Sequence, residues 1–332
     1  GYRAIWKHIM NVSVADLKKN YGNLDVHFDL WMGESDAQEY IPDMVDYLKD
    51  NGYAHYDQGA LVVDVKEETD TKEIPPCMIL KSDGAALYDT TDLATIIQRM
   101  KLYKPDEICY LADKRQELHF VQCFRCARKA KLVNDDTREG GVMRLERLIG
   151  EINDEMYQKI VENRSVKDTD ARGTAQIVGL SAIKYGDLSN QASKDYVFDV
   201  ERFTSFEGNT GPYILYTIVR TKSILGKYKE EGNELKKGAL LAPKSDSEKA
   251  LMLSVSRFNG VVENAFEEKA PHKICAYIYE LANEFNHFYH ETKILSEQDE
   301  ARKASYLALL DLVREVLETC IDLLGFSAPE RM

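Results

Sequence analysis

Residues 77–100, CMILKSDGAALYDTTDLATIIQRM, pass from a short apolar run through a turn into a helical pattern. The run Cys77–Leu80 has the length and composition of a buried strand, and Asp83-Gly84 is typical of a tight turn. The apolar residues of Thr91–Met100 recur at helical spacing. A strand that leads into a helix is the repeating unit of α/β folds, so this segment predicts an α/β sheet with parallel strands.

The same alternation extends through the first 150 residues, on both sides of this segment. The other elements predicted there are helices at Val14–Tyr21, Ile41–Asn51 and Leu118–Ala130, and strands at Asp25–Trp31, Ala60–Val65 and Glu107–Leu111. Further along, the predicted elements are helices at Val142–Glu162, Lys249–Phe266, Lys273–Leu295 and Arg302–Leu324, with a polar exposed loop at Lys229–Ser247. The second half of the chain therefore predicts a helical bundle.

Composition and charge set limits on the class of protein. The 332 residues are 44% hydrophobic with a formal net charge of −13, which fits a soluble globular chain and excludes a disordered one. No apolar run is long enough to span a membrane, and the first ten residues lack the apolar stretch of a secretory signal. We expect a cytoplasmic protein. The chain begins at Gly1, as a processed product or a piece of a longer protein would. Two basic clusters, Lys114–Lys131 and Arg220–Lys244, are most simply explained as solvated faces.

The cysteines and histidines do not predict a metal site. Six cysteines are too few for a disulfide scaffold, and we expect them to be reduced thiols. Cys123 and Cys126 form a C-x-x-C within a helical pattern, and no second pair follows at the spacing of a zinc site. His287, His290 and Glu291 match neither common helical zinc motif and flank an apolar helical face. We therefore predict no bound metal.

Five segments together resemble one family. They are KSDGAALYDTTDL (Lys81–Leu93), YLADKRQELHFVQCF (Tyr110–Phe124), GLSAIKYGDLS (Gly179–Ser189), YVFDVERFTSFEGNTGPYILY (Tyr196–Tyr216) and the terminal LLGFSAPERM. In this order along the chain they resemble the arginyl-tRNA synthetases, a class I aminoacyl-tRNA synthetase family. The resemblance implies the back half of a Rossmann-like catalytic domain at residues 1–141, connecting helices at 142–205 and a helical-bundle anticodon-binding domain at 206–332.

The resemblance also implies a set of arginine-binding residues, whose matching positions are Glu34, Tyr88, Asp92 and Gln116. A site for free arginine must hold a guanidinium, a planar fork of five donors that carboxylates bind in a bidentate way. Tyr88 and Asp92 are four residues apart at a helix start and so share one face. Without the resemblance, Asp92 would be taken for an ordinary exposed helix carboxylate and Tyr88 for a packed ring.

Other matching positions concern the nucleotide and the tRNA. We place His119 on the nucleotide side of the site, with helix capping as the alternative. The anticodon-contacting positions of the family match Tyr213, Tyr216, Phe285 and Met332. Single-stranded bases are recognised by stacking on aromatic rings and by hydrogen bonds to their edges. The alternative for Tyr213 and Tyr216 is that they are core aromatics at the start of a helix.

Two family motifs are missing. The HIGH-type motif, which binds ATP phosphates, does not occur in this sequence. Only the tail of the KMSKS-type loop remains, at Thr137–Gly141. Either this loop is deleted from the protein, or a mobile loop is missing from this sequence, and we favour the second.

The implied reaction is ATP-dependent ligation of L-arginine to its tRNA through arginyl-adenylate. ATP is a substrate with Mg²⁺, and we expect a monomer that has no permanent cofactor, does not bind membranes and is inactive as this fragment alone. The alternative is a non-catalytic tRNA-binding or interaction protein derived from a synthetase.

Overall fold

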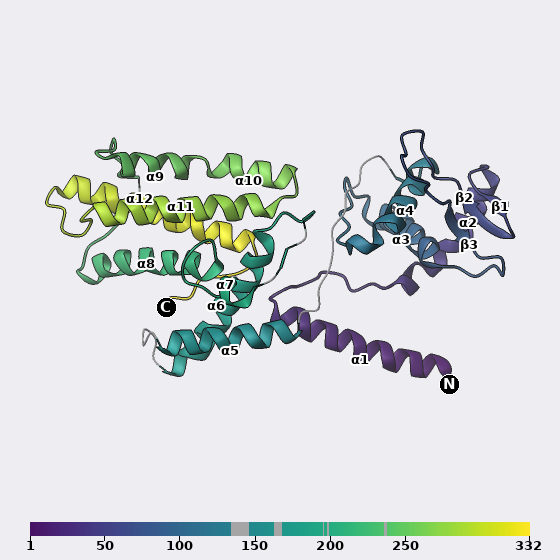
Figure 1. The fold of residues 1–332 in the computed structure, drawn as a ribbon, viewed down its shortest axis with the longest axis horizontal. Coiled ribbons are helices and arrows are strands. Elements are labelled where there is room, and N and C mark those ends of the chain that lie inside the picture. The colour runs from purple at the N-terminus through teal and green to yellow at the C-terminus, as the bar shows by residue number, and fades with distance from the viewer. Residues whose placement is uncertain (134–145, 163–167, 195, 198, 236–237) are drawn as a thin grey trace. The chain divides into compact units, whose positions relative to one another are not determined.

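The computed structural model describes residues 1–133, 146–162, 168–194, 196–197, 199–235 and 238–332 (Figure 1). The chain forms two compact units, one made of residues Phe28–Met143 and the other of Gly1–His27 with Arg144–Met332. This division differs from the boundaries expected from the sequence, because the first 27 residues group with the helical second half. The tail of the KMSKS-type loop at Thr137–Gly141 lies outside the described residues.

The unit 28–143 combines a small sheet with helices. Its elements, in chain order, are η1 (Glu34–Tyr40), α2 (Ile41–Asp50), β1 (His55–Asp57), β2 (Ala60–Val63), β3 (Cys77–Leu80), α3 (Tyr88–Tyr103), η2 (Lys114–Gln116) and α4 (Glu117–Lys129). Buried apolar residues from α2, β2, β3, α3 and α4 share one core, which includes Met44, Leu48, Leu61, Ile79 and Leu93. The helices predicted at 41–51, 91–100 and 118–130 are confirmed to within a few residues.

The prediction of parallel strands is wrong for the described sheet. Its order is β1-β2-β3, and both pairs are antiparallel. Asp57 pairs with Ala60, so only Gln58 and Gly59 connect β1 to β2, and both have positive φ, at 48° and 85°. A two-residue turn with two positive φ values reverses the chain, because a parallel pairing needs a much longer crossover.

Two predicted strands are absent from the described chain. Asp25–Trp31 fails as a strand because its first residues end a helix instead: Asp25 has φ of 50°, and the Val26 N–H bonds the Tyr21 carbonyl at 3.0 Å. Glu107–Leu111 also lacks strand pairing, and Leu111 is 99% exposed. An apolar run becomes a strand only where a neighbouring strand can take its backbone hydrogen bonds.

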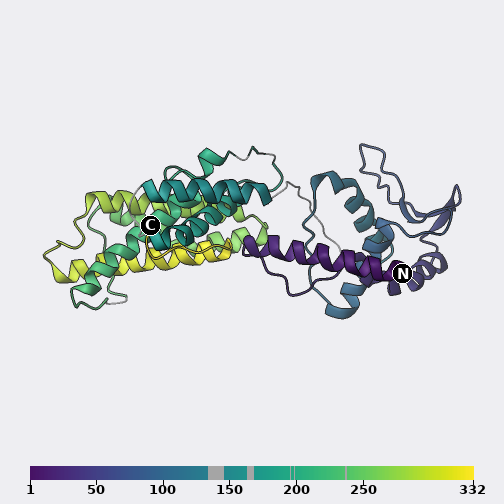
Figure 2. The ribbon, with the colours of Figure 1, turned by 90° about the horizontal axis from the view of Figure 1, so that it is seen from below.

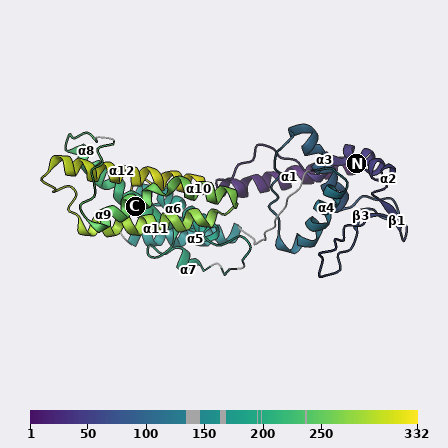
Figure 3. The same cartoon turned by 90° about the horizontal axis from the view of Figure 1, so that it is seen from above.

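The second unit is helical. Its elements are α1 (Tyr2–Asn23), α5 (Glu146–Glu162), α6 (Asp168–Leu188), α7 (Val200–Phe203), α8 (Gly211–Glu230), α9 (Asp246–Ser256), α10 (Phe258–Glu267), α11 (Pro271–Glu291) and α12 (Glu300–Leu323). In Figure 1 the bundle runs from α9 and α10 at the top through α11 and α12 to α8. The turned views of Figure 2 and Figure 3 show α12 extending along the length of the bundle.

The helical predictions for this unit hold, with changes at the ends. The helix predicted at 249–266 is two helices, because α9 ends at Ser256 and α10 begins at Phe258. The helix expected at 14–21 is part of the longer α1, none of whose residues is buried. The start of the helix predicted at 142–162 lies outside the described residues, and α5 covers the rest. Gly325 follows α12 with a positive φ of 79°, a conformation that glycine adopts readily after the last turn of a helix.

Candidate functional site

The first turn of α3 is fixed against the end of β3. The Thr90 hydroxyl donates to the Ile79 carbonyl at 2.6 Å and accepts from the Leu87 N–H at 3.0 Å. The Asp89 carboxylate accepts from the Met78 N–H at 3.3 Å. These bonds place Tyr88 and Asp92, one helical turn apart, at the exposed start of α3. The two residues lie on one helix, as their spacing indicated, and their role in binding arginine stays a prediction.

His119 lies between two carboxylates of α3. Its Nδ1 is 2.6 Å from Asp89 Oδ1, and its Nε2 is 2.6 Å from Asp92 Oδ2. Hydrogen bonds to Asp89 and then to Asp92 raise the pKa of His119 from 6.5 to about 9, against the opposing effect of burial. The ring is therefore an imidazolium at neutral pH, and the three side chains together carry a net charge of −1. This cluster holds the carboxylate that the sequence assigned to arginine.

The structure joins His119 to the predicted arginine ligand and gives no support to its placement on the nucleotide side. Helix capping does not apply either, because the N-cap residue of α4 is Gln116 and both His119 nitrogens are bound to side chains. Gln122, three residues further along α4, donates to the backbone carbonyls of Pro75 and Pro76. It therefore anchors the segment before β3.

A metal is not needed to explain this cluster. Cys123 Sγ lies 3.8 Å from His119 Nε2 and 4.0 Å from Asp89 Oδ1, so atoms of metal-binding types are close together. However, each ring nitrogen of His119 already directs a proton at a carboxylate, which leaves no lone pair for a metal ion. The cluster is an ion-pair network in this structure.

The other predicted arginine-binding residues lie on elements around α3. Glu34 is the first residue of η1, which packs on α3, and Gln98 of α3 donates to the Asp36 carbonyl of η1 at 2.9 Å. Gln116 immediately precedes α4, and both Glu34 and Gln116 are exposed. The Tyr88 ring is 70% exposed, so it is not the packed core ring of the alternative interpretation. Of these residues, Asp92 is the one whose contact with another predicted site residue, His119, is established.

In the helical unit, aromatic and polar side chains gather where α8 meets α11. The Arg220 guanidinium lies 4.7 Å from the centre of the Tyr216 ring and 5.4 Å from that of Tyr289. Its Nη1 donates to Asn286 at 2.7 Å, and its Nη2 donates to the Tyr216 hydroxyl at 3.0 Å. Tyr216 and Tyr289 are 42% and 36% exposed. We call Tyr216, Arg220, Asn286 and Tyr289 the α8–α11 surface.

The remaining predicted anticodon residues are less accessible. Tyr213 is half-buried: its hydroxyl donates to Asn283 at 2.7 Å and accepts from Asn286 at 2.9 Å. Phe285 is completely buried, so the prediction that its ring contacts a base does not fit the structure. Tyr289, whose ring stacks on Phe285, presents the exposed ring at that place. Met332 is half-buried and packs against the bundle core.

Two family models match the chain. Residues 1–200 match the model described as tRNA synthetases class I (R), catalytic domain, which covers more than half of the sequence. The chain belongs to the arginyl-tRNA synthetase family. Residues 214–332 match the model of the DALR anticodon binding domain. The predicted fold class, an α/β catalytic part followed by a helical anticodon-binding part, is confirmed, apart from the direction of the strands.

Curated members of the family align with the whole chain. The arginine–tRNA ligase of Agathobacter rectalis is 60% identical over 360 residues, and that of Alkaliphilus oremlandii is 54% identical over 352 residues. Both alignments cover 100% of this chain and 60% of the relative, so the chain spans about 60% of the length of these relatives. Because both alignments are longer than the 332 residues of the chain, each relative has internal residues without a counterpart here.

Solved structures of the family share the fold. The arginyl-tRNA synthetase of Plasmodium falciparum matches with a TM-score of 0.86 and 24% identity, over 99% of this chain and 59% of that one. The Thermus thermophilus enzyme matches with a TM-score of 0.82 and 22% identity, over 99% of this chain and 65% of that one. At these identities the comparison supports the fold alone. Among the described helices, none combines the length and apolar character of a membrane span.

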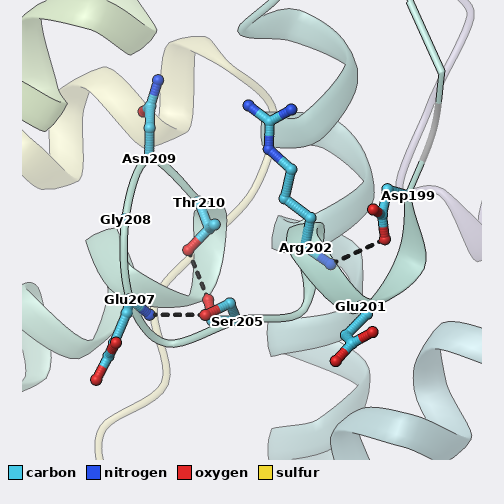
Figure 4. Close-up of a pocket in the computed structure, with 8 residues that line it drawn as sticks. All are labelled: Asp199, Glu201, Arg202, Ser205, Glu207, Gly208, Asn209 and Thr210. Carbon is cyan, nitrogen blue, oxygen red and sulfur yellow. Dashed lines mark hydrogen bonds between the residues drawn. The ribbon is translucent and has the colours of Figure 1, made fainter.

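A cavity of about 410 Å³ lies in the helical unit (Figure 4), and none of the residues that line it was predicted as a site residue. The residues that line it belong to α7 and the loop before α8, and they include Asp199, Arg202 and Glu207. Figure 4 shows the loop held by its own bonds: the Thr210 hydroxyl donates to the Ser205 carbonyl at 2.6 Å, and the Asp199 carboxylate accepts from the Arg202 N–H at 3.1 Å. These bonds shape the entry to α8, which carries Tyr213 and Tyr216.

Each basic cluster contains a charge that is paired with carboxylates. Arg125, in the first, binds Asp70 through two bonds of 2.7 and 2.8 Å, and this pair lowers the pKa of Asp70 from 3.8 to about 2. Lys222, in the second, pairs with Glu318 at 3.1 Å and Glu330 at 2.9 Å.

Sequence reasoning missed four residues that complete these sites. Asp89 lies next to Tyr88 in the motif, and its partner His119 is 30 positions away, so adjacency was the one available signal. Arg220 begins the second basic cluster and lies four positions after Tyr216, so helical spacing was the signal for their contact. Asn286 and Tyr289 follow Phe285 by one and four positions, and helical spacing was the signal that could have found Tyr289.

Proposed function

We propose that this chain supplies the arginine-binding and anticodon-binding parts of an arginine–tRNA ligase, which joins L-arginine to its tRNA through arginyl-adenylate. The observation that carries the proposal is the position of Asp92 at the exposed start of α3, within residues that match the family's catalytic model. Oδ2 of the Asp92 carboxylate accepts a hydrogen bond from His119, and its Oδ1 makes no hydrogen bond with any described residue. That oxygen is the acceptor offered to a guanidinium.

The residue types around Asp92 support selection of arginine over lysine. A guanidinium presents five donors in a plane, whereas an ammonium is a compact point charge. In the proposal, Asp92 and Glu34 bind the guanidinium, Tyr88 covers it with its ring, and Gln116 contacts the amino or carboxyl end of the substrate. Lysine would leave acceptors of such a site unpaired, which is costly in a partly dehydrated pocket.

The α8–α11 surface supports recognition of single-stranded RNA. Exposed tyrosine rings provide stacking platforms, and the amide of Asn286 and the guanidinium of Arg220 provide donors and acceptors for base edges. We propose that Tyr216 stacks on an anticodon base, with Tyr289 in the role that the sequence assigned to Phe285. Tyr213 and Met332 then border the site and fix its shape.

ATP and Mg²⁺ enter this proposal as substrate and its ion. The described residues contain no phosphate-binding loop, because the HIGH-type motif does not occur in the sequence and the KMSKS tail lies outside the described part. We also propose that the protein acts as a monomer in the cytoplasm. Light scattering that gives a mass near 37.9 kDa would support the monomer, and a mass twice as large would contradict it.

Calorimetric titration with L-arginine and L-lysine tests the proposal on the chain itself. We expect binding of arginine and at least tenfold weaker binding of lysine, because lysine cannot form the bidentate contact. A parallel titration with unacylated arginine tRNA tests the helical unit. Binding of tRNA without any binding of arginine would favour the alternative of a non-catalytic tRNA-binding protein.

A further inference from the structure

The two bonds of His119 fix its protonation state by geometry. A neutral imidazole has one N–H donor, and its other nitrogen is an acceptor. Here each nitrogen lies 2.6 Å from an oxygen of a different carboxylate, Asp89 on one side and Asp92 on the other. A carboxylate cannot donate, so both ring nitrogens must carry protons. The ring is a cation held between two anions.

Asp89, His119 and Asp92 form a hydrogen-bonded connection from the sheet to the surface, and their side chains become more exposed in this order. Asp89 is bound to the Met78 N–H of β3, and its side chain is 13% exposed. The exposed fraction of the side chain rises to 21% at His119 and to 30% at Asp92. The rigid end of the connection is therefore the strand, and the accessible end is Asp92, the proposed arginine ligand.

We propose that Asp89 and His119 are positioning residues, in which Asp89 keeps His119 doubly protonated and His119 holds Asp92 in the orientation that binds the guanidinium of arginine. The inference rests on the proposed function, since it assumes that Asp92 is an arginine ligand. It adds two residues that do not touch the substrate and assigns each a separate task. Asp89 sets the charge of the ring, and the ring sets the rotamer of Asp92.

The net charge of the three side chains makes arginine binding depend on the protonation of His119. With His119 protonated, the three side chains carry a net charge of −1, which a bound guanidinium neutralises. Loss of the second proton removes the donor to one carboxylate and leaves a net charge of −2. The pKa of His119, raised from 6.5 to about 9 by its bonds to Asp89 and Asp92, places this loss above the physiological range. The connection is intact below about pH 9 and is lost as the pH rises through that value.

Neighbouring groups do not titrate in a way that would mimic this effect below pH 9. The titratable and charged groups near the ring are Asp89 and Asp92 on α3, Cys123 on α4, Cys77 on β3, and Tyr110 with Arg99 beside it. A hydrogen bond with Cys77 lowers the pKa of the Cys123 thiol, but burial and the carboxylates outweigh it and the net change is upward. Burial likewise raises the pKa of the Tyr110 hydroxyl.

The experiment measures the His119 ring and arginine binding in the same 332-residue chain. Nitrogen-15 NMR of the histidine side chains follows the protonation of His119 in wild type and in Asp89→Asn. We expect wild type to titrate near pH 9 and the variant to titrate lower by about 1–3 pH units, because one of two neighbouring anions is gone. A wild-type ring that titrates near 6.5 would overturn the inference.

Arginine titrations from pH 6 to pH 10 supply the functional readout. At pH values below the His119 titration midpoint of each protein, wild type and Asp89→Asn should bind arginine within about threefold of each other. As the pH rises, Asp89→Asn should lose affinity at a lower pH than wild type. The free arginine amino group also titrates near pH 9, but it is common to both proteins, so the difference between them belongs to His119. His119→Gln should bind at least tenfold more weakly at every pH, with no midpoint of its own.

His287→Gln is the matched control, since His287 also pairs with a carboxylate, Glu291 at 3.3 Å, but lies on α11. It should bind arginine as wild type does. Melting curves establish that each variant is folded. If His119→Gln binds arginine like wild type while wild type itself binds, the inference fails and the proposed function stands. If wild type does not bind arginine, both fail.

Discussion

At the level of single residues, the proposed binding of arginine is tested most directly at Asp92. Asp92→Asn keeps the size of the side chain but removes the charge that faces the guanidinium. Because the carboxylate is 30% exposed, we expect a loss of about 2 kcal/mol, or roughly thirtyfold in arginine affinity, at the low end of the range for a disrupted charged pair. Calorimetry on the folded variant measures it. A change of less than twofold would mean that Asp92 is not a ligand.

Tyr213 and Tyr216 differ in exposure, and their variants should differ accordingly. Tyr216→Ala removes a ring that is 42% exposed, so it should weaken tRNA binding about tenfold or more and leave the melting temperature nearly unchanged. Tyr213→Ala breaks hydrogen bonds to Asn283 and Asn286 and should lower the melting temperature first. Filter binding and thermal melting on both variants decide the assignment. Early melting of both, with unchanged affinity of the folded fraction, would remove this pair from the anticodon site.

Sequence and structure agree where a residue's role depends on its near neighbours. The start of α3 was predictable because Tyr88 and Asp92 are one turn apart, and that spacing carries over directly into the structure. The bond from His119 to Asp89 joins positions 30 apart, so no local pattern contains it. Phe285 shows the reverse case, because it lies on the same apolar stripe of α11 as Leu281 and Phe288, and all three are fully buried. Helical spacing therefore indicated a packed ring, and only the match to a family position suggested contact with a base.

At the level of elements, the close crossing of α6 and α8 depends on Gly211. A Cβ added there would lie 2.3 Å from the backbone oxygen of Ser181, which cannot move away as a flexible side chain would. Gly211→Ala should therefore destabilise the helical unit by about 1–3 kcal/mol. Gly226→Ala, on the same helix with nothing within 4 Å, is the control and should stabilise it by about 0.5–1 kcal/mol. Urea unfolding of both variants measures the difference; equal effects would exclude steric crowding as the cause.

Helices were predicted better than strands for a physical reason. A helix satisfies its backbone within one segment, so the apolar spacing of α11 or α12 is enough to locate it. A strand needs a partner, and the alternating run at residues 25–31 has none in the described chain. The hairpin β1–β2 shows the converse, because its turn at Gln58-Gly59 decided the antiparallel direction that strand composition alone did not reveal.

At the level of the whole molecule, the chain holds the proposed arginine and anticodon sites without the HIGH-type motif. We expect the purified 332-residue chain to show no ATP–pyrophosphate exchange, because electrostatic stabilisation at the phosphates supplies several kcal/mol of the barrier reduction. Robust exchange above a heat-inactivated control would contradict this. Arginine binding measured on the same preparation shows that the protein is folded and that the inactivity belongs to the nucleotide side.

The exposed helix α1 determines what an optical measurement of this protein reports. The chain has two tryptophans, Trp6 on α1 and Trp31 in the segment before η1, and they are 53% and 39% exposed in the folded state. Neither belongs to either buried core. Their emission should therefore already lie at long wavelength in the native protein and change little when the bundle melts. Unfolding of the helical unit has to be followed by circular dichroism or by its buried tyrosines, and a flat tryptophan signal would not mean that the protein is stable.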